Sequence, residues 1–98
     1  MFNIKSRPRS QVIVCEASEC SFNRKNKCRA LGINVGGPEP LCDTFINDDM
    51  KGGVLNAATK VGACKVKSCV YNRLLQCTAR GIRVIFDNDR ALCVTYQL

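Results

Sequence analysis

Two stretches with the same cysteine spacing decide the fold: CEASECSFNRKNKC at residues 15–28 and CKVKSCVYNRLLQC at residues 64–77. Each follows the pattern C-x4-C-x7-C, and a fourth cysteine comes after 13 further residues in the first stretch and after 15 in the second. The first three cysteines of the two sets lie 49 residues apart. Self-similarity at a fixed offset indicates that one small unit is built twice.

The repeat extends beyond cysteine. Aromatic, asparagine, glycine and β-branched residues recur at matching positions. From the fourth cysteine onward, the positions match after a two-residue insertion in the second copy. The matching pairs are Phe22/Tyr71, Asn23/Asn72, Arg24/Arg73, Ala30/Ala79, Gly32/Gly81, Ile33/Ile82, Val35/Val84, Cys42/Cys93, Thr44/Thr95 and Phe45/Tyr96. The sequence therefore predicts two homologous four-cysteine modules, at residues 11–46 and 60–98. A linker at residues 47–59 joins them, and a flexible basic arm at residues 1–10 precedes the first module.

Each module is expected to be small and β-rich. Residues 11–14, 28–35 and 78–86 are rich in β-branched or alternating apolar residues, a pattern typical of strands. Residues 42–45 and 93–96 are predicted as short third strands, and residues 22–27 as a polar loop. Gly32 and Gly81, inside strand patterns, indicate a bulge or a close backbone approach.

A tiny apolar core is expected in each module. The predicted members are Ile33, Val35 and Phe45 in the first module and Ile82, Val84 and Tyr96 in the second. Two modules that share an interface bury more apolar area than either alone. This favours packing of the two copies with pseudo-twofold symmetry.

The cysteines are the expected source of stability, because a unit of this size rarely folds on its core alone. Four thiolates are the ligand set of a closed structural zinc site, which predicts two zinc ions, one per module. The predicted ligands are Cys15, Cys20, Cys28, Cys42, Cys64, Cys69, Cys77 and Cys93. Arg24 and Arg73 are candidates for stabilising the thiolate charge from outside the ligand set.

Two other cysteine chemistries remain open. An even number of cysteines in each set also allows two disulfides per module, in any of three pairings. Iron or an iron–sulfur cluster is a third alternative, although the spacings match neither of the usual ferredoxin runs.

Catalysis is not expected. The chain contains no histidine, which removes the commonest general base and the Cys–His nucleophile pair. It also lacks the C-x-x-C motif of dithiol redox enzymes. The absence of a secretory signal or a membrane-spanning run predicts a cytoplasmic protein with no membrane partner, in a compartment where thiols stay reduced.

The charge is strongly basic and unevenly distributed. The formal net charge is +7, of which residues 1–49 contribute +1 and residues 50–98 contribute +6. A basic face is typical of nucleic-acid binding. Eight thiolates with two zinc ions would reduce the net charge from +7 to +3, so nucleic acid is the weaker expectation and an unidentified protein the leading partner.

The combined motif resembles a bacterial domain-of-unknown-function family, numbered 1540. In the second module the motif is carried by Cys64, Cys69, Tyr71, Asn72, Cys77, Ala79, Ile82, Val84, Cys93 and Thr95. The first module carries it with Phe22 in the tyrosine position. The resemblance implies a bacterial source, largely among spore-forming species, and small proteins with one or two such modules. It implies no biochemical function.

Three functional hypotheses follow from these observations. The leading one is a non-enzymatic tandem zinc-binding protein that acts as an interaction scaffold. The second is a disulfide-crosslinked structural protein of a spore coat or envelope. The third is a nucleic-acid-binding zinc module that would use Lys60, Lys65, Lys67, Arg73, Arg80, Arg83 and Arg90.

Overall fold

The protein is seen in a computed structural model that describes residues 9–98, and within them it forms short strands and no helix. The small β-rich fold expected from the sequence is confirmed. Residues 1–8 of the predicted flexible arm lie outside the described residues, and Ser10, within that predicted arm, is buried. The strands are β1 (Gln11–Cys15), β2 (Asn23–Arg24), β3 (Lys27–Cys28), β4 (Gly32–Gly36), β5 (Leu41–Cys42), β6 (Lys60–Cys64), β7 (Asn72–Arg73), β8 (Gln76–Cys77), β9 (Gly81–Asp87) and β10 (Arg90–Cys93).

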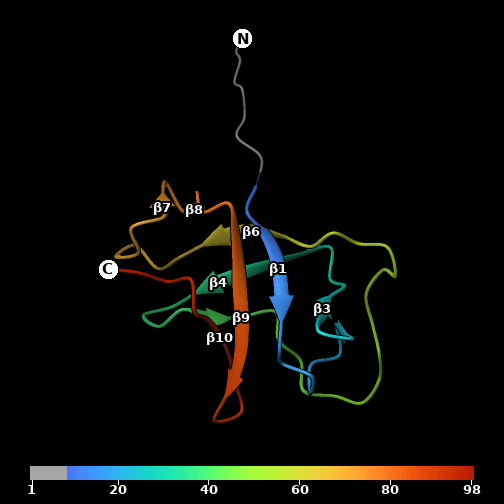
Figure 1. Ribbon diagram of the computed structural model, residues 1–98. Coiled ribbons are helices and arrows are strands. Elements are labelled where there is room, and N and C mark those ends of the chain that lie inside the picture. The colour runs from blue at the N-terminus through green and yellow to red at the C-terminus, as the bar shows by residue number, and fades with distance from the viewer. Residues whose placement is uncertain (1–8) are drawn as a thin grey trace.

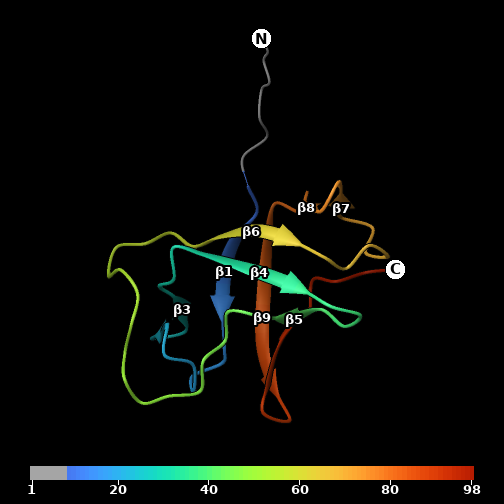
Figure 2. The ribbon, with the colours of Figure 1, turned by 180° about the vertical axis from the view of Figure 1, so that it is seen from behind.

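Six of these strands close into a barrel in the order β1-β6-β4-β5-β10-β9. Within each half, β4 pairs with β5 and β9 pairs with β10, both antiparallel. The other four contacts join the halves: β1 runs parallel to β9, β4 runs parallel to β6, and β1–β6 and β5–β10 are antiparallel. Figures 1 and 2 show this interleaving, with β1 beside β9 on one face and β4 beside β6 behind it. The halves therefore build one sheet together.

Within residues 9–98, no helix has the length and hydropathy to cross a bilayer.

The strand pairing is symmetric under exchange of the halves. Every register of β1 against β9 recurs between β6 and β4 at the 49-residue offset, including the position of the irregularity. Equivalent pairs are Val12↔Ile82 with Val61↔Ile33, and Cys15↔Val84 with Cys64↔Val35. This is the pseudo-twofold packing that the repeat predicted.

The prediction of a bulge at Gly32 and Gly81 is wrong, because the bulge lies on the strand paired with each glycine. The extra residue lies instead on the partner strands, at Ile13 of β1 and Gly62 of β6. Close approach holds at Gly81 alone: a Cβ there would collide with the Ile13 side chain, whereas at Gly32 the nearest atom, the Lys60 carbonyl oxygen, is 3.5 Å away. Glycine is needed at residue 81 because the bulge turns Ile13 over its backbone.

The expectation of a separate core in each module is wrong, because a single apolar core fills the barrel. The predicted core residues Ile33, Ile82, Val35 and Val84 are 1–3% exposed, and the aromatic residues Phe45 and Tyr96 pack against them. Val61 joins this core at 1% exposure. Among residues 9–98, four of the fourteen buried apolar residues are cysteines, so the core is continuous with the cysteine sets.

A tight hairpin replaces the polar loop that the sequence predicted at residues 22–27. β2 pairs with β3, and the equivalent β7 pairs with β8, each across a two-residue turn. Asn23 organises the first hairpin: its amide donates to the Cys15 carbonyl at 2.7 Å, and its side-chain oxygen accepts the Asn26 N–H at 3.3 Å. Asn72 does the same for the second hairpin, so the repeated asparagine ties each hairpin to the barrel.

The third strands end at the fourth cysteines and do not begin there, so the predicted ranges 42–45 and 93–96 are wrong. β5 and β10 end at Cys42 and Cys93, and the chain then turns. The threonine two residues later explains the turn, because its hydroxyl accepts a backbone N–H from the neighbouring strand. These bonds run from Asn34 to Thr44 at 3.2 Å and from Arg83 to Thr95 at 3.0 Å.

Three two-residue turns place both central residues at positive φ, as the favoured type I′ hairpin turns require. Their residues are Lys25-Asn26, Leu74-Leu75 and Asn88-Asp89, with φ between 51° and 67°. Asparagine and aspartate tolerate this region, whereas for leucine it is strained by roughly 1–2 kcal/mol per residue. The β7–β8 turn therefore stores strain that the equivalent β2–β3 turn relieves in part through Asn26.

Replacing both leucines, Leu74→Asn with Leu75→Gly, is expected to raise the free energy of unfolding by about 1–2 kcal/mol, because asparagine–glycine is the preferred pair for this turn. Chemical denaturation measures the change. The matched variant Lys25→Asn with Asn26→Gly should gain less. A less stable β7–β8 variant would contradict the strain argument.

Either half alone is expected to lack a monomeric fold. A chain of residues 58–98 would lose the strands that cover β6 and β9, and would expose Ile82 and Val84. Circular dichroism and sedimentation of this half, in excess zinc, should show an unfolded or self-associated chain. A monomer that unfolds cooperatively would contradict the interleaved barrel.

Candidate metal centre

The eight cysteines gather in two sets of four, and each set lines a small cavity. The first cavity, of about 10 Å³, is lined by Val12, Cys15, Ala17, Cys20, Phe22, Cys28, Ile33, Cys42, Thr44, Phe45, Val84 and Ala91. The second, of about 20 Å³, is lined by Val35, Pro40, Val61, Cys64, Val66, Cys69, Tyr71, Cys77, Ile82, Cys93, Thr95 and Tyr96. Each residue that lines one cavity has an equivalent residue lining the other. The cysteines that the sequence groups together therefore also lie together in space.

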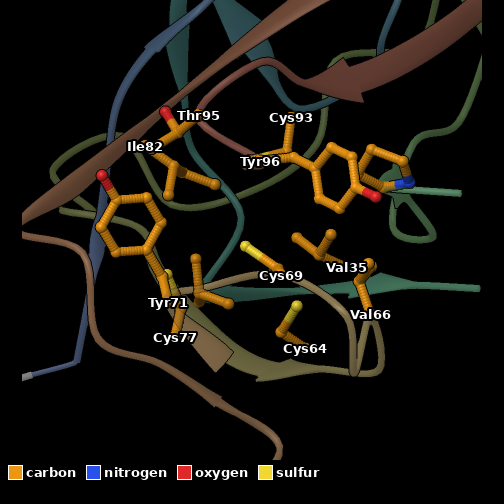
Figure 3. Close-up of a pocket in the computed structure, with 12 residues that line it drawn as sticks. Val35, Cys64, Val66, Cys69, Tyr71, Cys77, Ile82, Cys93, Thr95 and Tyr96 are labelled. Carbon is orange, nitrogen blue, oxygen red and sulfur yellow. The ribbon is translucent and has the colours of Figure 1, made fainter. Parts of the chain in front are cut away.

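Four different elements bring each set together. In the second half these are the end of β6 (Cys64), the turn after it (Cys69), the end of β8 (Cys77) and the end of β10 (Cys93). Figure 3 shows these cysteines around the cavity, with the rings of the two tyrosines on either side. Val35 lines this cavity from the first half. Each cysteine set is thus completed by a valine from the other half.

Burial disfavours the charged form of two thiols in the first set, Cys15 and Cys42. It raises the pKa of Cys42 to about 12, and the neighbouring thiols Cys28, Cys15 and Cys20 add to the increase. Burial is the largest cause that raises the pKa of Cys15, and the thiols of Cys28 and Cys20 add smaller increases. Because all four sulfur atoms influence one another, their negative charges would require a cation among them.

Backbone N–H groups oppose this effect. The N–H of Ala17 donates to the Cys15 sulfur and that of Thr44 to the Cys42 sulfur, and each lowers the pKa of its thiol. In the second set, burial raises the pKa of Cys93, and the N–H groups of Thr95 and Tyr96 lower it. Donors directed at sulfur stabilise a thiolate, so the backbone is already arranged for the ionised form.

The donor set fits zinc in chemistry and in size. A cavity of 10–20 Å³ accepts about one water molecule, and zinc with bonds of about 2.3 Å to sulfur is bound by four such thiolates. Within residues 9–98 all eight cysteines are free thiols, and no three His, Cys, Asp or Glu side chains already stand in a metal-binding arrangement. Metal binding would therefore require the thiols to rotate into the cavity.

The two arginine candidates lie on the hairpins. Arg24, on β2, is half-buried, and within the described residues its Nε has no hydrogen-bond partner. Arg73, on β7, is exposed. Neither is among the groups that shift the pKa of Cys15, Cys42 or Cys93. A role of these arginines beside the thiolates stays a prediction.

Sequence reasoning missed a strap that covers the first set, formed by residues 47–59 of the predicted linker. Asn47 bridges to Cys20, and the Gly52 N–H donates to the Ser21 carbonyl at 3.0 Å. The Lys51 ammonium donates to the carbonyls of Cys20 at 3.4 Å and Asn23 at 3.2 Å. The strap has no counterpart in the repeat, so the sequence predicted no more than a linker at residues 47–59.

The strap makes the two centres unequal. Ser21 is 6% exposed beneath it, whereas the equivalent Val70 is 56% exposed. Cys20 is likewise buried, while the equivalent Cys69 is half-buried. Access from solvent is therefore easier at Cys69 than at Cys20, whereas Cys42 is half-buried and its equivalent Cys93 is buried.

Comparison with known proteins identifies a family but no annotated relative. The model of a family described as Domain of Unknown Function (DUF1540) matches residues 13–51 and 63–96. Each matched segment contains one complete cysteine set. No curated protein and no solved structure matches the chain.

The strap predicts unequal thiol reactivity in the folded, reduced protein. During a short pulse of iodoacetamide, Cys69 should be alkylated faster than Cys20, as read by peptide mass spectrometry. Cys15 and Cys64 are an internal control, because they are 7% and 6% exposed and should react equally slowly. Equal rates at Cys20 and Cys69 would show that the strap does not shield the first set.

Proposed function

The chain belongs to the DUF1540 family, with two tandem copies of the domain, and we propose that it is a non-enzymatic zinc protein that binds one ion in each four-cysteine set. The observation that carries the proposal is the gathering of four thiols around each of two equivalent cavities. The ligands are Cys15, Cys20, Cys28 and Cys42 in the first set and Cys64, Cys69, Cys77 and Cys93 in the second.

The electrostatics of the sites support a cation. Four neighbouring thiolates in an apolar pocket repel one another, and a divalent ion compensates them while backbone N–H groups stabilise the sulfurs. Zinc binding also supplies folding free energy. The barrel benefits from it, because its core holds no tryptophan and is small.

A structural rather than catalytic role suits this ligand set. Four protein thiolates saturate tetrahedral zinc and leave no open position for water or substrate. The chain also has no histidine to act as a general base. The role proposed for the rigid barrel is that of an interaction scaffold, in the cytoplasm, where reducing conditions preserve free thiols.

Zinc content tests the proposal directly. Protein purified without reductant or chelator should carry two zinc ions by native mass spectrometry and eight free thiols after denaturation. Cys28→Ser and Cys77→Ser should each remove one ion, because three thiolates bind zinc more weakly than four. Chelation should unfold the barrel.

Ser68→Ala is the matched control, since it changes a serine near the second set without removing a thiol. It should retain both ions. Two zinc ions in either cysteine variant would contradict the ligand assignment. A metal-free protein lighter by eight hydrogens would replace zinc with four disulfides and favour the structural, crosslinked alternative.

A further inference from the structure

The β7–β8 turn is the most unusual surface feature of the protein. Leu74 is 91% exposed, the highest value among the exposed large apolar residues of the described chain, and Leu75 is 44% exposed. Both lie at positive φ, where leucine is strained. The equivalent turn, Lys25-Asn26, adopts the same backbone with polar side chains.

Local structure does not explain the two leucines. The hairpin geometry is available to polar residues, as the β2–β3 turn shows. Leucine at these positions both strains the backbone and leaves apolar surface in water. A binding partner that buries the leucines explains both features at once.

The segment of chain that carries the turn is basic. Residues 60–81 contain no aspartate or glutamate, and their five basic residues are Lys60, Lys65, Lys67, Arg73 and Arg80. Arg73 directly precedes the turn and is exposed. The acidic residues of the second half, Asp87 and Asp89, lie at the β9–β10 turn, and Figure 1 shows that turn at the opposite end of the barrel from β7 and β8. A zinc tetrathiolate, with a charge of −2, would leave this region positive.

A projecting apolar tip among cations matches the chemistry of an anionic membrane surface. Leucine side chains enter the acyl boundary of the bilayer, while arginine and lysine bind lipid phosphates. Nucleic acid offers the phosphates but no apolar layer for the leucines. A second copy of the chain offers no receptor among the described cavities, since those of about 10 and 20 Å³ are too small for a leucine side chain.

We propose that Leu74 and Leu75, with the basic residues of segment 60–81, dock the protein onto an anionic lipid surface. The contact is peripheral and involves no spanning segment. It revises the expectation of no membrane partner, which rested on the lack of an apolar run long enough to cross a bilayer. The docking involves no direct contact with a metal, because neither the two leucines nor the basic residues are among the proposed ligands.

Vesicle co-sedimentation tests this docking with the full chain. The protein should bind vesicles of equal parts phosphatidylcholine and phosphatidylglycerol at least about tenfold more tightly than vesicles of phosphatidylcholine alone, and added salt should weaken the binding. Leu74→Asn with Leu75→Gly should lower the affinity by about tenfold or more, because burial of two leucine side chains exceeds the ~1.4 kcal/mol that tenfold represents. Arg73→Gln should lower binding to the anionic vesicles alone.

The turn variant keeps the net charge and favours the hairpin, so a folded, more stable protein that no longer binds is the expected result. Leu31→Asn is the matched control: Leu31 is 80% exposed, lies between β3 and β4, and should be dispensable. Equal binding by the turn variant and the natural chain would overturn the proposal, as would equal loss in the control. Failure of the natural chain to bind anionic vesicles would also overturn it and leave a protein with an acidic apolar pocket as the occupant.

Discussion

The parallel pairing of β1 with β9, repeated between β4 and β6, is the contact on which the rest of the structure depends. Neither half could close the sheet alone. Of the six barrel strands, only β4 and β5 pair with each other within the first half, and only β9 and β10 do so within the second half. The same pairing sets Cys15 opposite Val84 and Cys64 opposite Val35. The first cysteine of each set is therefore held by the other half. An ion bound in one set would stabilise strands of both halves, which couples the two centres through the barrel.

This coupling matters because the core is small. Its buried apolar residues are mainly valine, isoleucine, alanine and cysteine, each of which removes little apolar area from water. Burial of the cysteines also raises the pKa of Cys42 to about 12, so a metal-free core places neutral thiols where a hydrocarbon side chain would pack. The cysteines thus contribute to the core as small apolar groups and, with a metal, as ligands. Removing one ligand would affect both roles.

The sequence predicted the parts of this arrangement that repeat. Cysteine spacing located both sets, and β-branched patterns located β1, β9 and the core valines. The pairing of strands between the two halves could not be predicted in this way. The alternation along β9 reveals which of its faces is buried, but not which strand lies beside it. The β7–β8 hairpin was missed for a physical reason, since Leu74-Leu75 contradicts the turn chemistry that identifies such hairpins. The strap at 47–59 was missed because its contacts are made by its backbone groups and by the side chains of Lys51 and Thr59, which the cysteine repeat does not mark.

Divergence between the copies is concentrated on the surface. Glu39 and Arg90 occupy equivalent positions beside the β5–β10 contact and form an ion pair of 2.7 Å, which two identical copies could not make. Glu16 and Arg83 form a second ion pair between the halves, also of 2.7 Å. Exposed pairs of this kind contribute little stability, about 0.2–1 kcal/mol each. Like the strap at the first cysteine set and the two leucines at the second hairpin, they make the two halves chemically different. The shared core thus maintains the symmetric fold, while the unmatched residues lie at the surface.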